Sequence, residues 1–262
     1  MEGKQGFIIE EYNKWIAPYR DAADRLLIRI HTLNDAYRRN SADYPIHNVQ
    51  SRLKKEESIK EKLVRKGFEP TLENAKEYLS DIAGIRIICY FEEDVYLMVQ
   101  QLKRQKDMLL LREKDYIANP KKNGYQSYHL VFGFPVYGID DMEYYPVEVQ
   151  IRTLTMDLWA SMEHRVIYKS KHVKTQERHE QAKEAFQQFG IELSSLERSM
   201  HQLVVPSSEK EGEELKESKP VQEKRNQLQG ESSDEHLSER GENKVGNIFS
   251  KHNKGNAVLY TE

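Results

Sequence analysis

The run Ile85-Arg-Ile-Ile-Cys-Tyr-Phe91 constrains the fold of this chain more than any other segment. Its apolar residues fall on both faces of a β-strand, so other elements must cover both faces of a strand over 85–91. Further candidate strands lie at residues 108–111, 128–134 and 147–151. A buried strand among several others predicts a mixed β-sheet of about five strands, flanked by helices.

Helical patterns alternate with these strands. Apolar residues recur at helical spacing over residues 12–39, which predicts a long N-terminal helix. Ser51 is expected to cap a second helix that runs to about Lys66 and ends at Gly67, and a third helix is expected over 71–79. Later helices are expected over 94–106, 155–168 and 175–203. The fold class predicted from this order is α/β (α+β), with long N- and C-terminal helices.

Composition divides the chain near Pro206. Hydrophobic residues make up 38% and charged residues 32% of the 262 positions, against averages of about 45 to 50% and about 25% in globular chains. Residues 206–262 carry nine basic and twelve acidic residues, a difference that accounts for the whole net charge of -3. Because this segment has too little apolar surface to offset its ordering entropy, we expect a folded domain over 1–205 and a disordered charged tail over 206–262.

The single cysteine, Cys89, excludes an intrachain disulfide and is expected to be a buried, inert thiol. Residues 1–10 hold too short an apolar stretch for a signal peptide, and no later segment approaches the ~18 apolar residues of a membrane span. We therefore expect a cytoplasmic protein that does not enter a membrane. A near-neutral body also argues against a surface devoted to nucleic acid.

Polar residues interrupt the packing patterns in several clusters. In the first, Lys54, Ser58 and Lys62 would lie at i, i+4 and i+8 on one face of the second predicted helix. Two ammonium groups around a hydroxyl suit a polyphosphate, which needs several donors in a row. A solvated basic helix face is the alternative interpretation.

Two further clusters lie on predicted strands. Asp81 precedes the strand that carries Arg86, and a carboxylate at a strand end can hold Mg²⁺, although it can also cap a turn. Glu148, Gln150 and Arg152 alternate with apolar residues, which places an acid, an amide and a guanidinium on one strand face. A half-solvated strand would show the same alternation.

A turn at Asn123-Gly124 leads directly into a predicted strand, so it would present Tyr125 at an exposed edge near several cations. An aromatic ring beside Lys and Arg can stack on a base while the cations neutralise phosphates. A hairpin with a partly buried tyrosine is the alternative.

Taken together and in order, these segments resemble a known family. The motifs are Arg-x-Lys-x-x-x-Ser-Ile-x-x-Lys at 52–62, Asp-Ile-Ala-Gly-Ile-Arg at 81–86, Lys-Asp-Tyr-Ile at 114–117, Lys-x-Asn-Gly-Tyr-Gln-Ser-x-His at 121–129, and Val-Glu-Val-Gln-Ile-Arg-Thr at 147–153. They resemble the synthetase domain of the RelA/SpoT family, and in particular its stand-alone small alarmone synthetases. The resemblance covers about residues 12–200, and five motifs in one order are far more specific than any single one.

The resemblance implies a nucleotidyltransferase-like synthetase fold and a GTP pyrophosphokinase of the stringent response. Such an enzyme transfers the β,γ-pyrophosphate of ATP to the ribose 3'-OH of GDP or GTP, giving (p)ppGpp and AMP. Asp81 and Glu148 would hold Mg²⁺, Glu148 would also accept the 3'-OH proton, and His129 would complete the catalytic set.

The same resemblance implies the substrate contacts. Arg52 and Arg86 would enclose the adenine, while Lys54, Ser58 and Lys62 would bind the ATP phosphates. The residues implied on the acceptor side are Tyr125 against the guanine, Lys114, Lys121, Asn123 and His129 around it, and Gln150 as a support for Glu148.

Regulation and assembly are also implied. Small members of the family are typically homotetramers, and some bind the alarmone product or single-stranded RNA. The regulated subgroup carries a Phe and a Thr where this chain has Asn48 and Gln50, so both regulatory ligands remain open. No His is followed by Asp, so hydrolase activity is not expected.

Two rival functions remain open. One is a catalytically silent nucleotide- or RNA-binding regulator, and the other is a nucleotidyltransferase. AMP release would indicate pyrophosphate transfer, and pyrophosphate release would indicate nucleotidyl transfer.

Overall fold

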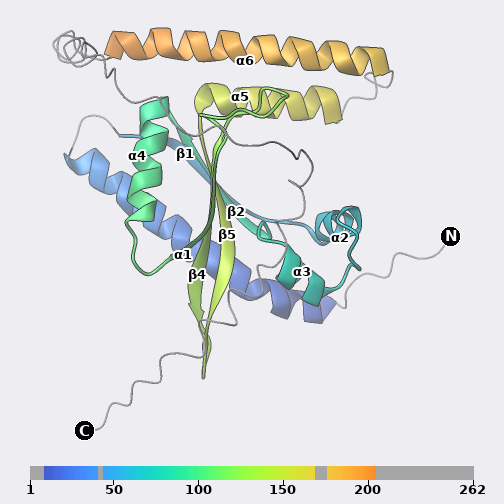
Figure 1. Cartoon of the computed structure of the whole chain (residues 1–262). Helices are drawn as coiled ribbons and strands as arrows, with labels where there is room; N and C mark the ends of the chain where they lie inside the picture. The colour runs from blue at the N-terminus through green and yellow to red at the C-terminus, as the bar shows by residue number, and fades with distance from the viewer. Residues whose placement is uncertain (1–8, 41–43, 169–175, 205–262) are drawn as a thin grey trace, which may run out of the picture.

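The computed structural model of the chain describes residues 9–40, 44–168 and 176–204 (Figure 1). Its centre is a five-stranded sheet in the order β1-β2-β5-β4-β3. The strands are β1 (Ile46–Leu53), β2 (Ala83–Cys89), β3 (Leu109–Asp115), β4 (Tyr128–Tyr137) and β5 (Met142–Thr153). β2 and β5 pair in parallel, and the other neighbours pair antiparallel. The predicted mixed sheet of about five strands is therefore confirmed.

Two helices cover one face of this sheet, α1 (Ile9–Asn40) and α4 (Glu92–Lys103). Their apolar stripes join the inward residues of β2, β4 and β5 in one core, and α1 crosses behind the strands in Figure 1. Cys89 is fully buried in this core, and burial raises the pKa of its thiol well above the usual range. The expectation of an inert, buried cysteine agrees with this environment.

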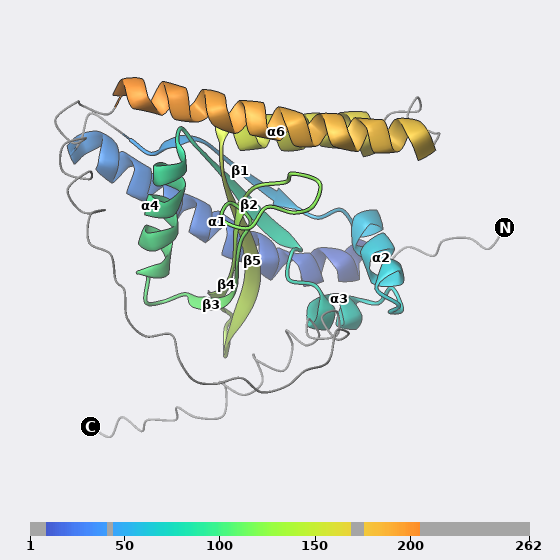
Figure 2. The same cartoon turned by 45° about the horizontal axis from the view of Figure 1, so that its top comes forward.

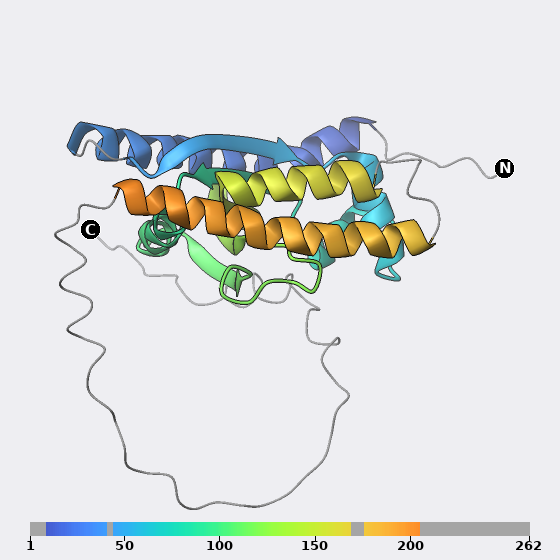
Figure 3. The same cartoon turned by 90° about the horizontal axis from the view of Figure 1, so that it is seen from above.

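The remaining helices lie outside the α1/α4 layer. α2 (Glu56–Arg65) and α3 (Leu72–Tyr78) pack together on the opposite side of the molecule from α4 (Figure 2). α5 (Leu154–Glu163) continues directly from β5 and passes into a short π-helix, η1 (His164–Tyr168). α6 (Gln176–Val204) lies beside α5 at the end of the sheet where β2 and β5 finish (Figure 3).

The expected start of the second helix is wrong. Ser51 lies in β1, where it pairs with Ile85, and α2 begins only at Glu56. β1 is an edge strand whose side chains are mostly exposed, so it lacks the apolar alternation that would have revealed it. In consequence Lys54 lies between β1 and α2 and does not share a helix face with Ser58 and Lys62.

Other boundaries shift by a few residues. The strand expected at 108–111 extends as β3 to Asp115, where the consecutive charged residues Arg112 to Asp115 fall on both strand faces and give no period-two pattern. None of the described helices is both long and apolar enough to cross a membrane. The tail predicted at 206–262 lies outside the described residues.

Candidate active site

Strand register assembles the candidate site on the sheet face that points away from α4. One row of paired residues crosses all five strands in the order Gln50, Arg86, Gln150, His129 and Lys114. The next row runs through Arg52, Gly84, Glu148, Val131 and Arg112. Residues from all five motifs therefore become neighbours, because side chains two apart on a strand share a face.

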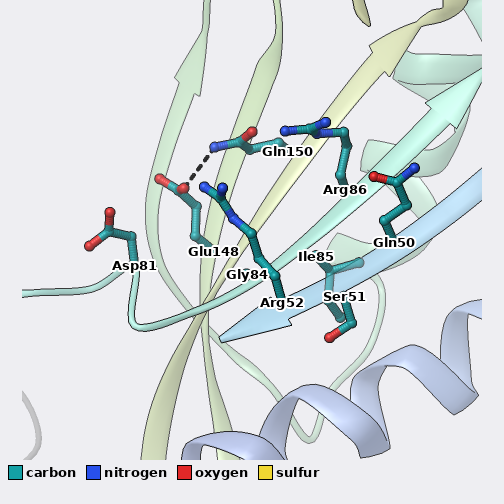
Figure 4. Close-up of a pocket in the computed structure, with 9 residues that line it drawn as sticks. All are labelled: Gln50, Ser51, Arg52, Asp81, Gly84, Ile85, Arg86, Glu148 and Gln150. Atoms are coloured by element: carbon teal, nitrogen blue, oxygen red, sulfur yellow. Dashed lines mark hydrogen bonds between the residues drawn. The ribbon is translucent and has the colours of Figure 1, made fainter. Parts of the chain in front are cut away.

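A first cavity of about 80 Å³ lies at the β1 side of this face. In Figure 4, Asp81, Glu148 and the guanidinium of Arg52 gather at one side of it, and Arg86 lies at the other. Gly84 lies between the Arg52 and Glu148 backbones and leaves the space above β2 free of a side chain. The lining residues are Gln50, Ser51, Arg52, Asp81, Gly84, Ile85, Arg86, Glu148 and Gln150.

A second, strongly basic cavity of about 300 Å³ lies at the β3 side. Five cationic side chains line it, and Glu148 is its one carboxylate. Its lining residues are Lys62, Lys66, Tyr78, Ser80, Arg112, Lys114, Tyr116, Lys121, His129, Val131 and Glu148. Because several fixed cations suit a ligand with several negative charges, this cavity is chemically matched to a polyphosphate. Glu148 lines both cavities and so lies where they meet.

Asp81 is the acid that connects Lys54 and Lys62 to the sheet. Its Oδ2 accepts hydrogen bonds from Lys54 Nζ at 2.5 Å and Lys62 Nζ at 2.7 Å. Burial opposes ionisation of Asp81, but the two ammonium groups outweigh it and hold its pKa at about 2. Within the described part of the chain, the buried Oδ1 has no hydrogen-bond partner. An ionised carboxylate with one free buried oxygen fits a divalent-cation ligand.

Glu148 is the second buried carboxylate. Gln150 Nε2 donates to its Oε2 at 2.8 Å, and His129 Nδ1 lies 3.7 Å from its Oε1. Burial and the charge of Asp81 favour the protonated form, but the contacts with His129 and Gln150 outweigh them, so the pKa of Glu148 is lowered. Glu148 is therefore ionised at neutral pH and can accept a proton. Gln150 therefore contacts Glu148 directly, and its supporting role in catalysis stays a prediction.

A chain of hydrogen bonds sets the proton positions around His129. Arg152 Nη2 donates to the Tyr125 hydroxyl at 2.6 Å, and that hydroxyl lies 2.8 Å from His129 Nε2. The ionised Glu148 carboxylate can only accept, so it favours the His129 tautomer with the proton on Nδ1, and in that tautomer Nε2 accepts from the Tyr125 hydroxyl. Burial lowers the pKa of His129, so the imidazole is neutral at neutral pH.

Tyr125 is held in place by the loop that carries it. Gly124 adopts φ +89°, a left-handed conformation that turns the chain into the site. Asn123 Oδ1 accepts from the Tyr125 backbone N–H at 3.3 Å. Two side chains of α6 also hydrogen-bond to the loop: Gln187 donates to the Lys122 carbonyl, and Ser194 donates to Gln126 Oε1. Lys121 Nζ lies 4.7 Å from the Tyr125 ring centroid. The expected pairing of an aromatic ring with a cation is present.

Most predicted site residues line one of the two cavities, and four do not. Ser58 is exposed on α2, one turn before Lys62, and lines neither cavity. Asn123 is engaged with its own turn and donates to Glu163 Oε1 at 3.2 Å. Their roles in substrate binding stay predictions. Lys54 reaches the site through Asp81, and Tyr125 through His129.

Sequence reasoning left several site residues without a role. Lys66 and Arg112 line the basic cavity, and Arg112 Nη2 also donates to Ser80 Oγ at 2.8 Å. Arg112 could have been found, because it stands two positions before Lys114 and a strand over both would place them on one face. Nothing in the local sequence indicated Asp157, which comes from α5, accepts a hydrogen bond from Arg152 and forms an ion pair with Arg86.

Comparison with known proteins agrees with this geometry. Residues 51–173 match a region described as found in RelA / SpoT proteins. GTP pyrophosphokinase YwaC of Bacillus subtilis (strain 168) is 42% identical over 162 residues, which cover 62% of this chain and 77% of the relative. The chain belongs to the RelA/SpoT family. A second B. subtilis relative, GTP pyrophosphokinase YjbM, is 37% identical over 160 residues, which cover 61% of this chain and 74% of the relative.

Solved structures match a larger share of this chain than these two relatives do. The structure of small alarmone synthetase 1 of B. subtilis, bound to its product pppGpp, is 32% identical in sequence. The match covers 74% of this chain and 96% of the synthetase chain, with a TM-score of 0.67. A GTP pyrophosphokinase family protein of Streptococcus pneumoniae is 33% identical. The match covers 78% of this chain and 97% of the S. pneumoniae chain, with a TM-score of 0.66. The RelA/SpoT resemblance read from the five motifs is confirmed.

Proposed function

We propose that this protein is a GTP/GDP pyrophosphokinase that transfers the β,γ-pyrophosphate of ATP to the ribose 3'-OH of GDP or GTP. The observation that carries the proposal is the position of Glu148, an ionised carboxylate at the junction of an arginine-lined cavity and a basic cavity. Two substrates that meet at a proton acceptor are what such a transfer requires. The relatives' activity and the pppGpp and AMPCPP bound in structures of small alarmone synthetase 1 support it.

On this proposal ATP occupies the side of the first cavity. Arg52 and Arg86 line that cavity and would enclose the adenine. Lys54 and Lys62, which contact Asp81, would turn to the ATP phosphates, with Ser58 on the same helix as Lys62. That exchange would transfer their positive charge to the phosphates and free the Asp81 carboxylate.

The acceptor nucleotide would occupy the basic cavity. Lys114 and Lys121 would neutralise its phosphates, and Tyr125 would stack on the guanine with Asn123 holding the loop. The acceptor 3'-oxygen attacks the β-phosphorus of ATP, the bond from that phosphorus to the oxygen bridging the α-phosphate breaks, and AMP leaves with that oxygen. Glu148 takes the 3'-OH proton, while His129 and Gln150 hold its carboxylate in place.

Asp81 and Glu148 are the residues that would hold Mg²⁺. Both are ionised, both line the first cavity, and the buried Asp81 Oδ1 has no hydrogen-bond partner among the described residues. Bound there, Mg²⁺ would neutralise phosphate charge beside the reacting phosphorus. Every proton movement in the proposal is carried out by the chain's own side chains.

The test follows the labelled γ-phosphate of ATP into the nucleotide products. Purified protein is incubated with Mg²⁺ and γ-labelled ATP, with GDP and GTP in separate reactions, and the products are resolved by anion-exchange chromatography. We expect label in ppGpp and pppGpp, with one AMP per product and no transfer when EDTA removes the metal. Release of pyrophosphate in place of AMP would instead establish a nucleotidyltransferase. Nucleotide binding without transfer would establish a silent regulator.

We further infer a cytoplasmic homo-oligomer, in which copies associate as a tetramer. The lone buried Cys89 suits a reducing compartment, and an exposed apolar groove between α5 and α6 suits association. Residues 1–205 would form the catalytic domain, with 206–262 as a tail. Control by the alarmone product or by single-stranded RNA remains open at Asn48 and Gln50, which lie on the edge strand β1.

A further inference from the structure

Arg152 is a buried arginine at the centre of the site, only 5% exposed. Its Nη2 donates to the Tyr125 hydroxyl at 2.6 Å and to Gln150 Oε1 at 3.1 Å. Its Nε lies 3.3 Å from Ser127 Oγ, and its Nη1 lies 3.3 Å from Asp157 Oδ1. All three guanidinium nitrogens are therefore engaged, which a lysine could not reproduce.

Asp157 connects this arginine to the other cavity. The same oxygen, Oδ1, lies 3.3 Å from Arg86 Nη1 and 3.3 Å from Arg152 Nη1. Asp157 lies in the first turn of α5, four residues after the Thr153 N-cap, whose hydroxyl donates to the buried Glu197 of α6 at 2.6 Å. The carboxylate is thus placed by a helix start that α6 holds, and it separates two like charges that would otherwise repel.

We propose that Asp157 and Arg152 form a positioning bridge between the two cavities, so that a nucleotide in one cavity strengthens binding in the other. The bridge runs from Arg86 in the first cavity through Asp157 and Arg152 to Tyr125 and His129 at the second. The inference rests on the proposed function for the identity of the two ligands. It assigns Arg152 and Asp157 no contact with substrate.

The physical basis is ordering shared between two ligands. Both contacts at Asp157 Oδ1 are 3.3 Å, longer than the optimum of about 2.9 Å for N–H···O, so they can shorten. A ligand that fixes Arg86 fixes Asp157, then Arg152, and through Arg152 the Tyr125 hydroxyl. The second ligand then meets a side chain that is already ordered and binds more tightly.

Titration calorimetry with two unreactive partners tests the bridge. AMPCPP cannot transfer its pyrophosphoryl group, because a methylene replaces the oxygen that must leave. With Mg²⁺ present, we expect saturating AMPCPP to tighten GDP binding about tenfold, and GDP to tighten AMPCPP by the same factor. Asp157→Asn should bind each nucleotide alone yet reduce the coupling to less than about twofold. The matched control is Asp140→Asn, an exposed acid on the β4–β5 turn, which should keep full coupling.

Two further variants address folding and the far end of the bridge. Tyr125→Phe keeps the ring and removes the hydroxyl, so it should lose coupling like Asp157→Asn. Arg152→Lys keeps the positive charge and loses the several N–H donors of the guanidinium, so it should also lose the coupling. Thermal unfolding of each variant shows whether it is folded. Full coupling in folded Asp157→Asn and Tyr125→Phe would overturn the bridge, as would independent binding in the unmodified protein. Failure of both nucleotides to bind would instead overturn the proposed function.

Discussion

Glu148 and Tyr125 make separable contributions at the scale of single residues. Glu148→Gln keeps the shape of the side chain and removes the proton acceptor, so we expect kcat to fall by a factor of about 10² to 10⁴ with both nucleotides still bound.

Tyr125→Ala removes a stacking surface, so it should mainly raise the acceptor KM, by roughly tenfold for a stack of about 1 to 3 kcal/mol. Steady-state kinetics of folded variants decide both. Near-normal turnover in Glu148→Gln would exclude it as the base, and an unchanged acceptor KM would remove Tyr125 from the guanine site.

Asp81 should leave a signature in acid stability. Its pKa is about 2 in the folded chain against 3.8 for the free side chain, so the unfolded state binds protons first as the pH falls. The ion pairs thus contribute about 2 kcal/mol above pH 3.8, and that contribution is lost between pH 3.8 and pH 2. Urea unfolding in EDTA should show this loss in the unmodified protein and in Asp140→Asn. Asp81→Asn should lack it, and parallel curves for all three would contradict the assignment.

The loop that carries Tyr125 can be tested at the scale of elements. Gly124 has φ +89° and lies against Trp159 and α6, whereas Gly67, after α2, has φ +82° and nothing within 4 Å of an added Cβ. Alanine at either position should cost about 1 to 2 kcal/mol in backbone strain. Only Gly124→Ala should also raise the acceptor KM, because it displaces the adjacent Tyr125. Equal acceptor KM values for Gly67→Ala and Gly124→Ala would show that the loop does not position the ring.

At the scale of the whole molecule, an exposed apolar groove of about 620 Å³ is lined by residues of both α5 and α6. Met162, Phe189 and Leu196 line it and are each about half exposed. Exposed apolar surface of this kind marks an interface, so we expect light scattering to give about four times the 30.9 kDa of one chain. Phe189→Glu should lower that mass. Ile139→Glu, on the fully exposed β4–β5 turn, should not, and a monomeric unmodified protein would refute the tetramer.

A truncation tests the domain boundary. The residues of both cavities lie between Gln50 and Gln150, and the described packing ends with α6 at Val204. A chain that stops at residue 205 should therefore keep its kcat and both KM values within about twofold, since surface changes away from packed features have small effects. A large loss of turnover in the truncated chain would show that residues 206–262 take part in catalysis or assembly.

Much of the fold follows from local patterns. Apolar spacing was sufficient for α1 and α6, and apolar runs for β2 and β4, because burial of a face imposes a period that is visible in sequence. The strand β1 was not predicted, because an edge strand with exposed side chains shows no such period. The same limit shortened β3 and hid the alignment of Arg112 with Lys114 on its site face.

The candidate site divides in the same way. By itself the sequence determined the chemistry: the acids at 81 and 148, the cations, and the aromatic at 125, because motif order and residue type are local properties. Only the tertiary structure decided that Lys54 and Lys62 share Asp81, that Glu148 lies where two cavities meet, and that Asp157 joins two arginines. These relations depend on strand register and on where α5 begins, which are set by packing between segments far apart in the chain.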